Sequence, residues 1–77
     1  MTSVVVYTRQ GCGLCRTAEA LVHDLAGGRA EIRHVDIDAD PELVDRYGVR
    51  VPVVAVDGVE VGELVIEPDV LADALRS

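Results

Sequence analysis

The chain has 77 residues, of which 49% are apolar, and it carries seven basic against fourteen acidic residues for a net charge of −7. This length predicts one domain spanning residues 1–77, and the charge argues against nucleic acid and anionic membrane surfaces as partners. No stretch reaches the roughly 18 uninterrupted apolar residues of a membrane span, and no signal-peptide pattern is present, so we expect a cytoplasmic protein that is a monomer.

The first part of the chain predicts a strand, a helix and a second strand. Ser3 to Tyr7 is a short apolar run that suits a strand buried on both faces. Residues 13–26 repeat apolar side chains at helical spacing, and Gly27-Gly28 ends the pattern. The inward positions of this helix are Leu14, Ala18, Leu21, Val22 and Leu25. Residues 30–36 alternate as a second strand should.

The remainder predicts a helix, a hairpin and a final helix. Asp40 suits a helix N-cap and Pro41 the first helical position, with the helix ending at Gly48. Two strand-like runs follow at residues 53–56 and 59–61, and the Asp57-Gly58 between them is typical of a type I′ turn. Residues 68–76 form a short helix whose expected inward face is Val70, Leu71, Ala74 and Leu75.

This order, β-α-β-α-β-β-α, predicts an α/β fold with a four-stranded mixed sheet flanked by three helices. The first β-α-β unit should cross over with a right hand and give parallel neighbours. The hairpin then adds antiparallel strands on the other side of the first strand. The first strand is therefore central, and it delivers Cys12 to the carboxyl edge of the sheet, where open α/β folds place their sites.

Both cysteines of the chain lie in Gly11-Cys12-Gly13-Leu14-Cys15, between the first strand and the first helix. A Cys-x-x-Cys in this position favours redox chemistry. Free N–H groups and the positive end of the helix dipole should lower the pKa of Cys12 from about 8.5 toward roughly 3.5–7.5. Arg9 and Arg16 bracket the motif and favour thiolate further. We expect Cys12 to be the attacking sulfur and Cys15 the resolving one.

Metal binding is the main alternative, since one Cys-x-x-Cys is half of a zinc site. His23 lies eight residues beyond Cys15, about 12 Å along the helix axis, and cannot share an ion with both sulfurs. His34 belongs to the neighbouring strand, at the sheet surface. A dimer that shares two cysteine pairs, or that bridges an iron–sulfur cluster, stays open, as does a redox-inert adaptor. No metal or cofactor is expected for a monomer.

Two segments resemble glutaredoxin-like proteins of the thioredoxin superfamily. The first runs from Val5 to Cys15 and contains the Cys-Gly-Leu-Cys motif, and the second, residues 47–53, contains Val51-Pro52. On sequence alone an X-Pro bond is expected to be trans, whereas the resemblance implies a cis bond opposite the cysteines. The motif differs from the usual family pattern at Gly13-Leu14.

The resemblance implies a thioredoxin-like fold of glutaredoxin size and a thiol–disulfide oxidoreductase. It makes Cys12 and Cys15 catalytic and implies disulfide-containing protein or small-molecule substrates. Substrate contacts are expected from Arg9, Gly11, Gly13, Leu14, Val51 and Pro52. The reducing partner is either glutathione, acting as reductant, or a flavoprotein of the thioredoxin-reductase type. Only one glycine, Gly62, stands where glutaredoxins carry the Gly-Gly that helps to grip glutathione, so the sequence leaves the electron donor open.

Overall fold

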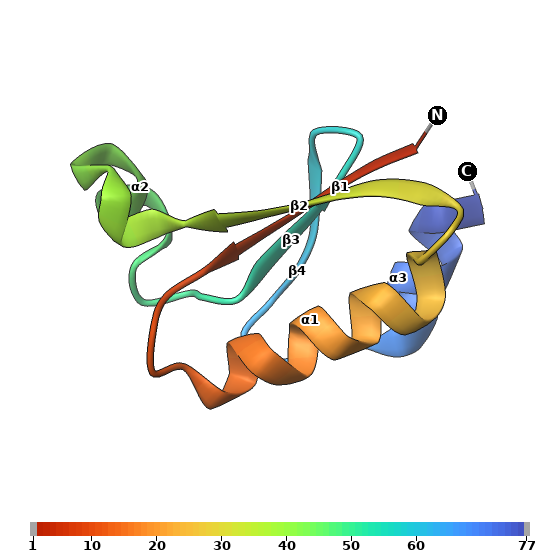
Figure 1. Ribbon diagram of the computed structural model, residues 1–77, viewed down its shortest axis with the longest axis horizontal. Coiled ribbons are helices and arrows are strands. Elements are labelled where there is room, and N and C mark those ends of the chain that lie inside the picture. Colours follow the sequence, from red (N-terminus) through yellow and green to blue (C-terminus); the bar gives the residue numbers. More distant parts are fainter. Residues whose placement is uncertain (1, 77) are drawn as a thin grey trace.

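The architecture is a four-stranded mixed sheet with helices on both faces, as the sequence predicts (Figure 1). The computed structural model describes residues 2–76, so residues 1 and 77, the two ends of the expected domain, lie outside the described residues. The strands are β1 (Thr2–Thr8), β2 (Ala30–Asp36), β3 (Val53–Val56) and β4 (Val59–Glu63). The helices are α1 (Gly13–Ala26), α2 (Pro41–Tyr47) and α3 (Pro68–Arg76), and a 3₁₀ turn, η1 (Ile37–Ala39), precedes α2.

The strand order is β2-β1-β3-β4, with β1 in the interior of the sheet. β1 runs parallel to β2 and antiparallel to β3, and β3 and β4 form the expected hairpin. Asp57 and Gly58 have φ values of 50° and 85°, and positive values at both central residues are those a type I′ turn requires. The pairing of Tyr7 with Val53 fixes how β1 and β3 meet at the edge that leads to the cysteines.

The two faces of the sheet have separate cores. α1 and α3 lie together over one face (Figure 1). There Val4 and Val6 of β1 pack with the buried side of α1 and with Leu71 of α3. The opposite face holds a smaller cluster, in which Ile37 and Tyr47 pack with Val53. Alternation along the strands sends neighbouring residues to these two cores, because successive side chains point to opposite faces.

Burial on both faces was expected for β1 and is found for β3 instead. Val5 and Tyr7 of β1 are only half-buried, whereas all four residues of β3 are buried. The half-buried residues of β1 point to the face of the sheet that has the smaller core. The end of β4 also differs from the prediction, because the strand continues to Glu63 and does not end at residue 61.

Aspartates cap two of the helical elements, and one of them, Asp40, was predicted to do so. Asp40 caps α2 by accepting a hydrogen bond from the Glu42 N–H at 2.9 Å, and Asp36 caps η1 through the Asp38 N–H at 3.0 Å. Asp36 and Asp40 therefore act as structural caps. In α3 the expected inward residue Val70 is 44% exposed. Leu71 is the residue of this helix that is fully buried. Within residues 2–76 no helix is long and apolar enough to cross a membrane.

Candidate active site

The cysteine motif lies between the end of β1 and the first turn of α1. Gly11, with a φ of 73°, turns the backbone in a region that other residues rarely adopt. Cys12 is the N-cap of α1, and its Sγ accepts a hydrogen bond from the Cys15 N–H at 3.1 Å. The two sulfurs are joined in a disulfide, with Cα atoms 5.2 Å apart. The sulfur at the helix start is thus in contact with a free N–H group, as the motif position predicts.

The two cysteines differ sharply in exposure. Cys15, in the first turn of α1, is fully buried, whereas Cys12 is partly exposed. No acidic residue occupies the first turn of α1 to oppose a thiolate there. A substrate arriving from solvent therefore meets Cys12 first, and Cys15 is reached only through Cys12.

The Val51-Pro52 bond is cis, as the family resemblance implies. Continuing the β1–β3 register beyond Tyr7 and Val53 places Pro52 opposite Thr8, at the end of β1 that leads to the motif. Pro52 is buried, whereas Val51 is half-buried. Within residues 2–76 neither the N–H nor the C=O of Val51 has a hydrogen-bond partner. These two groups are the kind that an extended peptide can pair with as an added strand.

Arg50, which the sequence analysis missed, anchors this proline segment. Its guanidinium donates to Glu60 and Glu63 at 3.1 and 3.0 Å and lies 5.3 Å above the Tyr47 ring. The hydrogen bonds to these two carboxylates raise the pKa of Arg50 above its ordinary value. The Arg50 carbonyl also accepts the Leu64 N–H at 3.2 Å. Its place directly before Val51-Pro52 was the signal available in the sequence.

Arg9 lies at the start of the loop between β1 and the motif, but it is not a free cation. Its guanidinium donates to Asp38 at 2.6 Å and to the Gly48 carbonyl at 3.3 Å. The hydrogen bond from Arg9 holds the pKa of Asp38 below its usual range. Arg16 likewise pairs with Glu19 at 2.9 Å. Each arginine that brackets the cysteine motif is therefore paired with a carboxylate, Arg9 with Asp38 and Arg16 with Glu19.

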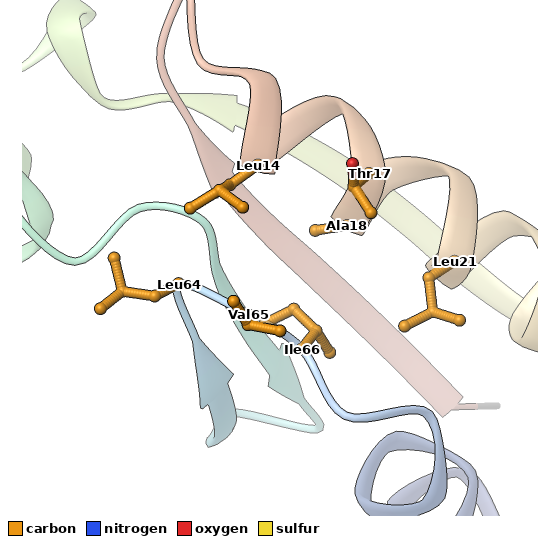
Figure 2. Close-up of a pocket in the computed structure, with 7 residues that line it drawn as sticks. All are labelled: Leu14, Thr17, Ala18, Leu21, Leu64, Val65 and Ile66. Atoms are coloured by element: carbon orange, nitrogen blue, oxygen red, sulfur yellow. The ribbon is translucent and has the colours of Figure 1, made fainter.

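An apolar groove of about 50 Å³ runs beside the motif (Figure 2). One wall is α1, with Leu14 from between the two cysteines, and the other is the connection from β4 to α3. Its lining is Leu14, Thr17, Ala18, Leu21, Leu64, Val65 and Ile66. Leu14, expected to face inward, is 46% exposed, and Leu64 and Val65 are 42% and 69% exposed. The sequence analysis missed Leu64 and Val65. The available signal was that both are apolar and lie outside every predicted strand and helix.

Leu64 holds a backbone conformation that disfavours a leucine. Its φ is 63°, in the left-handed region, which costs of order 1–2 kcal/mol for a residue with a side chain. Its N–H is shared between the carbonyls of Arg50 and Pro52, at 3.2 and 2.9 Å. These bonds fix the far wall of the groove to the segment that carries the cis proline.

The structure therefore brings the expected site residues to one edge of the sheet in two groups. Gly11, Cys12, Gly13, Leu14 and Cys15 form the first, and Val51 with Pro52 form the second. The Cβ position of Gly13 has no atom within 4 Å, so the space above it is open. Within residues 2–76 no group of three or more histidine, cysteine or acidic residues is arranged to hold a metal ion.

Comparison with protein families matches residues 3–77 to the family described as Glutaredoxin-like domain (DUF836). No protein with a curated description matches the chain. Among solved structures, a structural genomics target from X. campestris is 30% identical, with a TM-score of 0.80 and 95% of each chain covered. A point mutant of thioredoxin from Halobacterium salinarum NRC-1 is 31% identical, with a TM-score of 0.69 over 97% of this chain and 72% of that one.

Mitochondrial thioredoxin 3 from Saccharomyces cerevisiae is also similar, with 21% identity and a TM-score of 0.67 over 97% of this chain and 76% of that one. That likeness supports the fold alone. Together with the two structures above, it agrees with the predicted thioredoxin-like arrangement of sheet and helices.

Proposed function

The chain belongs to the glutaredoxin-like domain family of the thioredoxin superfamily, and from this premise we propose that it is a thiol–disulfide oxidoreductase that reduces disulfides of other proteins. The observation that carries the proposal is the pairing of a partly exposed Cys12 at a helix N-cap with a fully buried Cys15. One sulfur is open to an incoming disulfide, and the other can act only on the first.

In the reduced protein, the Cys12 thiolate attacks one sulfur of the substrate disulfide. That S–S bond breaks, the second substrate sulfur leaves as a thiolate and takes up a proton, and Cys12 is held in a mixed disulfide. The Cys15 thiolate then attacks the Cys12 sulfur and releases the first substrate sulfur. The substrate gains two electrons and two protons, and the Cys12–Cys15 disulfide seen here is the oxidised product.

The surroundings of Cys12 favour a polypeptide substrate. An extended segment pairs with the N–H and C=O of Val51, which have no partner within residues 2–76. An apolar side chain next to the substrate cysteine fits the groove between Leu14 and Leu64. The open space above Gly13 lets the substrate backbone approach. Arg9, already bound to Asp38, offers less to the carboxylates of a small anionic thiol such as glutathione.

Regeneration of the dithiol requires an external two-electron donor, either two glutathione molecules or a flavoprotein reductase. An assay of disulfide reduction driven in parallel by glutathione with its reductase and by thioredoxin reductase identifies the donor. Turnover with either one supports the proposal. Turnover with neither, together with stoichiometric zinc or iron on the purified protein, contradicts it and favours the metal-binding alternative.

The roles of the two cysteines are tested by trapping. With an oxidised protein substrate, Cys15→Ser should accumulate a mixed disulfide that is visible on a non-reducing gel, and Cys12→Ser should not. In the reduced wild type, Cys12 should react with iodoacetamide near neutral pH faster than a free cysteine does. Alkylation of Cys15 first, or of Cys12 at the rate of free cysteine, refutes the assignment.

A further inference from the structure

Two histidines that lie far from the cysteines meet across the outer face of α1 and β2. His23 is in the last turn of α1 and His34 is on β2, and both are exposed. Their Nε2 atoms are 3.0 Å apart, and the ring centroids are separated by 5.2 Å. Eight residues separate His23 from Cys15, about 12 Å along the helix, so the pair is distinct from the redox site.

Glu19 determines which nitrogen of His34 is available. Its Oε2 lies 3.2 Å from Nδ1 of His34, and because an ionised carboxylate only accepts hydrogen bonds, that nitrogen carries the proton. In the neutral tautomer of His34 that this contact selects, Nε2 carries no proton, and its lone pair is directed at His23. The other oxygen of Glu19 accepts from the Arg16 Nε at 2.9 Å, which fixes the carboxylate. In this tautomer of His34, the hydrogen bond between the two rings is donated by His23.

The spacing of the two nitrogens is close to that of a chelating pair. Two bonds of about 2.0–2.1 Å from imidazole nitrogens to a metal place those nitrogens about 2.9 Å apart at a right angle and about 3.3 Å apart at the tetrahedral angle. The observed 3.0 Å lies between these values, and both rings are exposed, so they can turn until their lone pairs converge on one ion in place of the shared proton. The partial negative charge at the end of α1 also favours a cation.

We propose that His23 and His34 bind one divalent first-row transition metal ion, with copper(II) bound more tightly than nickel or zinc. Imidazole nitrogens are good ligands for all three ions, and affinity rises to copper(II) and falls again to zinc. Glu19 is the positioning residue, since a carboxylate on the second nitrogen of a ligating histidine orients the ring and raises its basicity. Because the chain supplies only two ligands, water completes the coordination.

The test uses the untagged, oxidised protein, in which the Cys12–Cys15 disulfide keeps both sulfurs from binding or reducing copper. Calorimetric titration with copper(II), nickel(II) and zinc(II) should give one equivalent with copper(II) the tightest, and electron paramagnetic resonance should show nitrogen ligands to copper. Glu19→Gln should weaken binding 10- to 100-fold. Asp24→Asn, an exposed neighbour on α1 with the same change of charge, should alter it far less.

Each alternative result overturns part of the proposal. Failure of the oxidised wild type to bind one equivalent, or unchanged binding by the variant carrying both His23→Gln and His34→Gln, excludes the site. Equal effects of Glu19→Gln and Asp24→Asn show that Glu19 contributes only charge. The oxidoreductase proposal is unaffected in every case, because disulfide reduction by Cys12 and Cys15 does not pass through these histidines.

Discussion

The apolar groove beside the cysteines gives a quantitative prediction about substrate preference. Replacing Leu14 and Leu64 together by serine removes one leucine from each wall of the groove (Figure 2). These side chains are 46% and 42% exposed in the free protein. Full burial of a leucine stabilises by about 1.5–3 kcal/mol, so a substrate that covers the remaining area of both gains about 1.3–2.6 kcal/mol.

That free energy corresponds to a loss of about tenfold to eightyfold in kcat/KM for a protein disulfide when both leucines are replaced. The assay is the reduction of insulin, with dithiothreitol as the donor so that the physiological reductant plays no part. Reduction of hydroxyethyl disulfide, which has no side chain to fill the groove, should change by less than a factor of about three. The matched control is Val59→Ser, which removes an exposed apolar residue at the far end of β4.

Two results would refute this reasoning. If the double variant reduces insulin as well as the wild type does, the groove does not contact substrate. If it loses activity equally toward insulin and hydroxyethyl disulfide, the leucines act on the cysteines rather than on substrate. Thermal melts of the oxidised variants show whether lost stability accounts for an equal loss of activity toward both substrates.

Three further predictions concern single residues. Gly13→Ala should stabilise the protein by up to about 1 kcal/mol in a denaturant melt, because alanine favours a helix and nothing lies within 4 Å of the new Cβ; the same variant should lower kcat/KM for insulin if the substrate backbone passes over Gly13. Asp38→Asn should flatten the acid limb of the stability–pH curve: the pKa of Asp38 is lowered by Arg9, so the pair stabilises the fold fully above the ordinary aspartate value and loses this contribution as pH falls through the lowered one. Equal slopes for the two proteins would contradict that account. Leu71→Ala should cost about 2–5 kcal/mol, whereas Val70→Ala, at a position 44% exposed, should cost less than about 1 kcal/mol in the same urea titration.

The order of elements could be predicted because each boundary has a local chemical signal. Asp40 and Pro41 mark the start of α2, and the two residues of the Asp57-Gly58 turn both take the positive φ values that the dipeptide favours. The cis bond before Pro52 could not be predicted from spacing, since most X-Pro bonds are trans. Only the likeness of residues 47–53 to the glutaredoxin-like pattern implied it.

Features that depend on contacts between distant segments could not be predicted. From the sequence, Arg9 was expected to act as a cation near the cysteines. In the fold it is paired with Asp38, which lies 29 residues further along the chain. His23 was expected to lie too far along its helix to share an ion with both cysteines, and His34 was expected at the sheet surface. Their contact depends on the packing of α1 against β2, which brings the two rings together. Leu14 has helical spacing that suits the core, but it is 46% exposed, and its neighbour Cys15 takes the fully buried position in the first turn of α1.

The unequal exposure of the two cysteines also sets the order of events in the proposed disulfide reduction. Since Cys15 has no exposed surface, the agent that restores the dithiol and the molecule that consumes it must both approach the sulfur of Cys12. The two partners therefore bind one at a time, and the proposed disulfide reduction proceeds as two half-reactions without a ternary complex. Such a ping-pong scheme gives parallel double-reciprocal plots when both partners are dilute, and an excess of either partner competes with the other for access to Cys12.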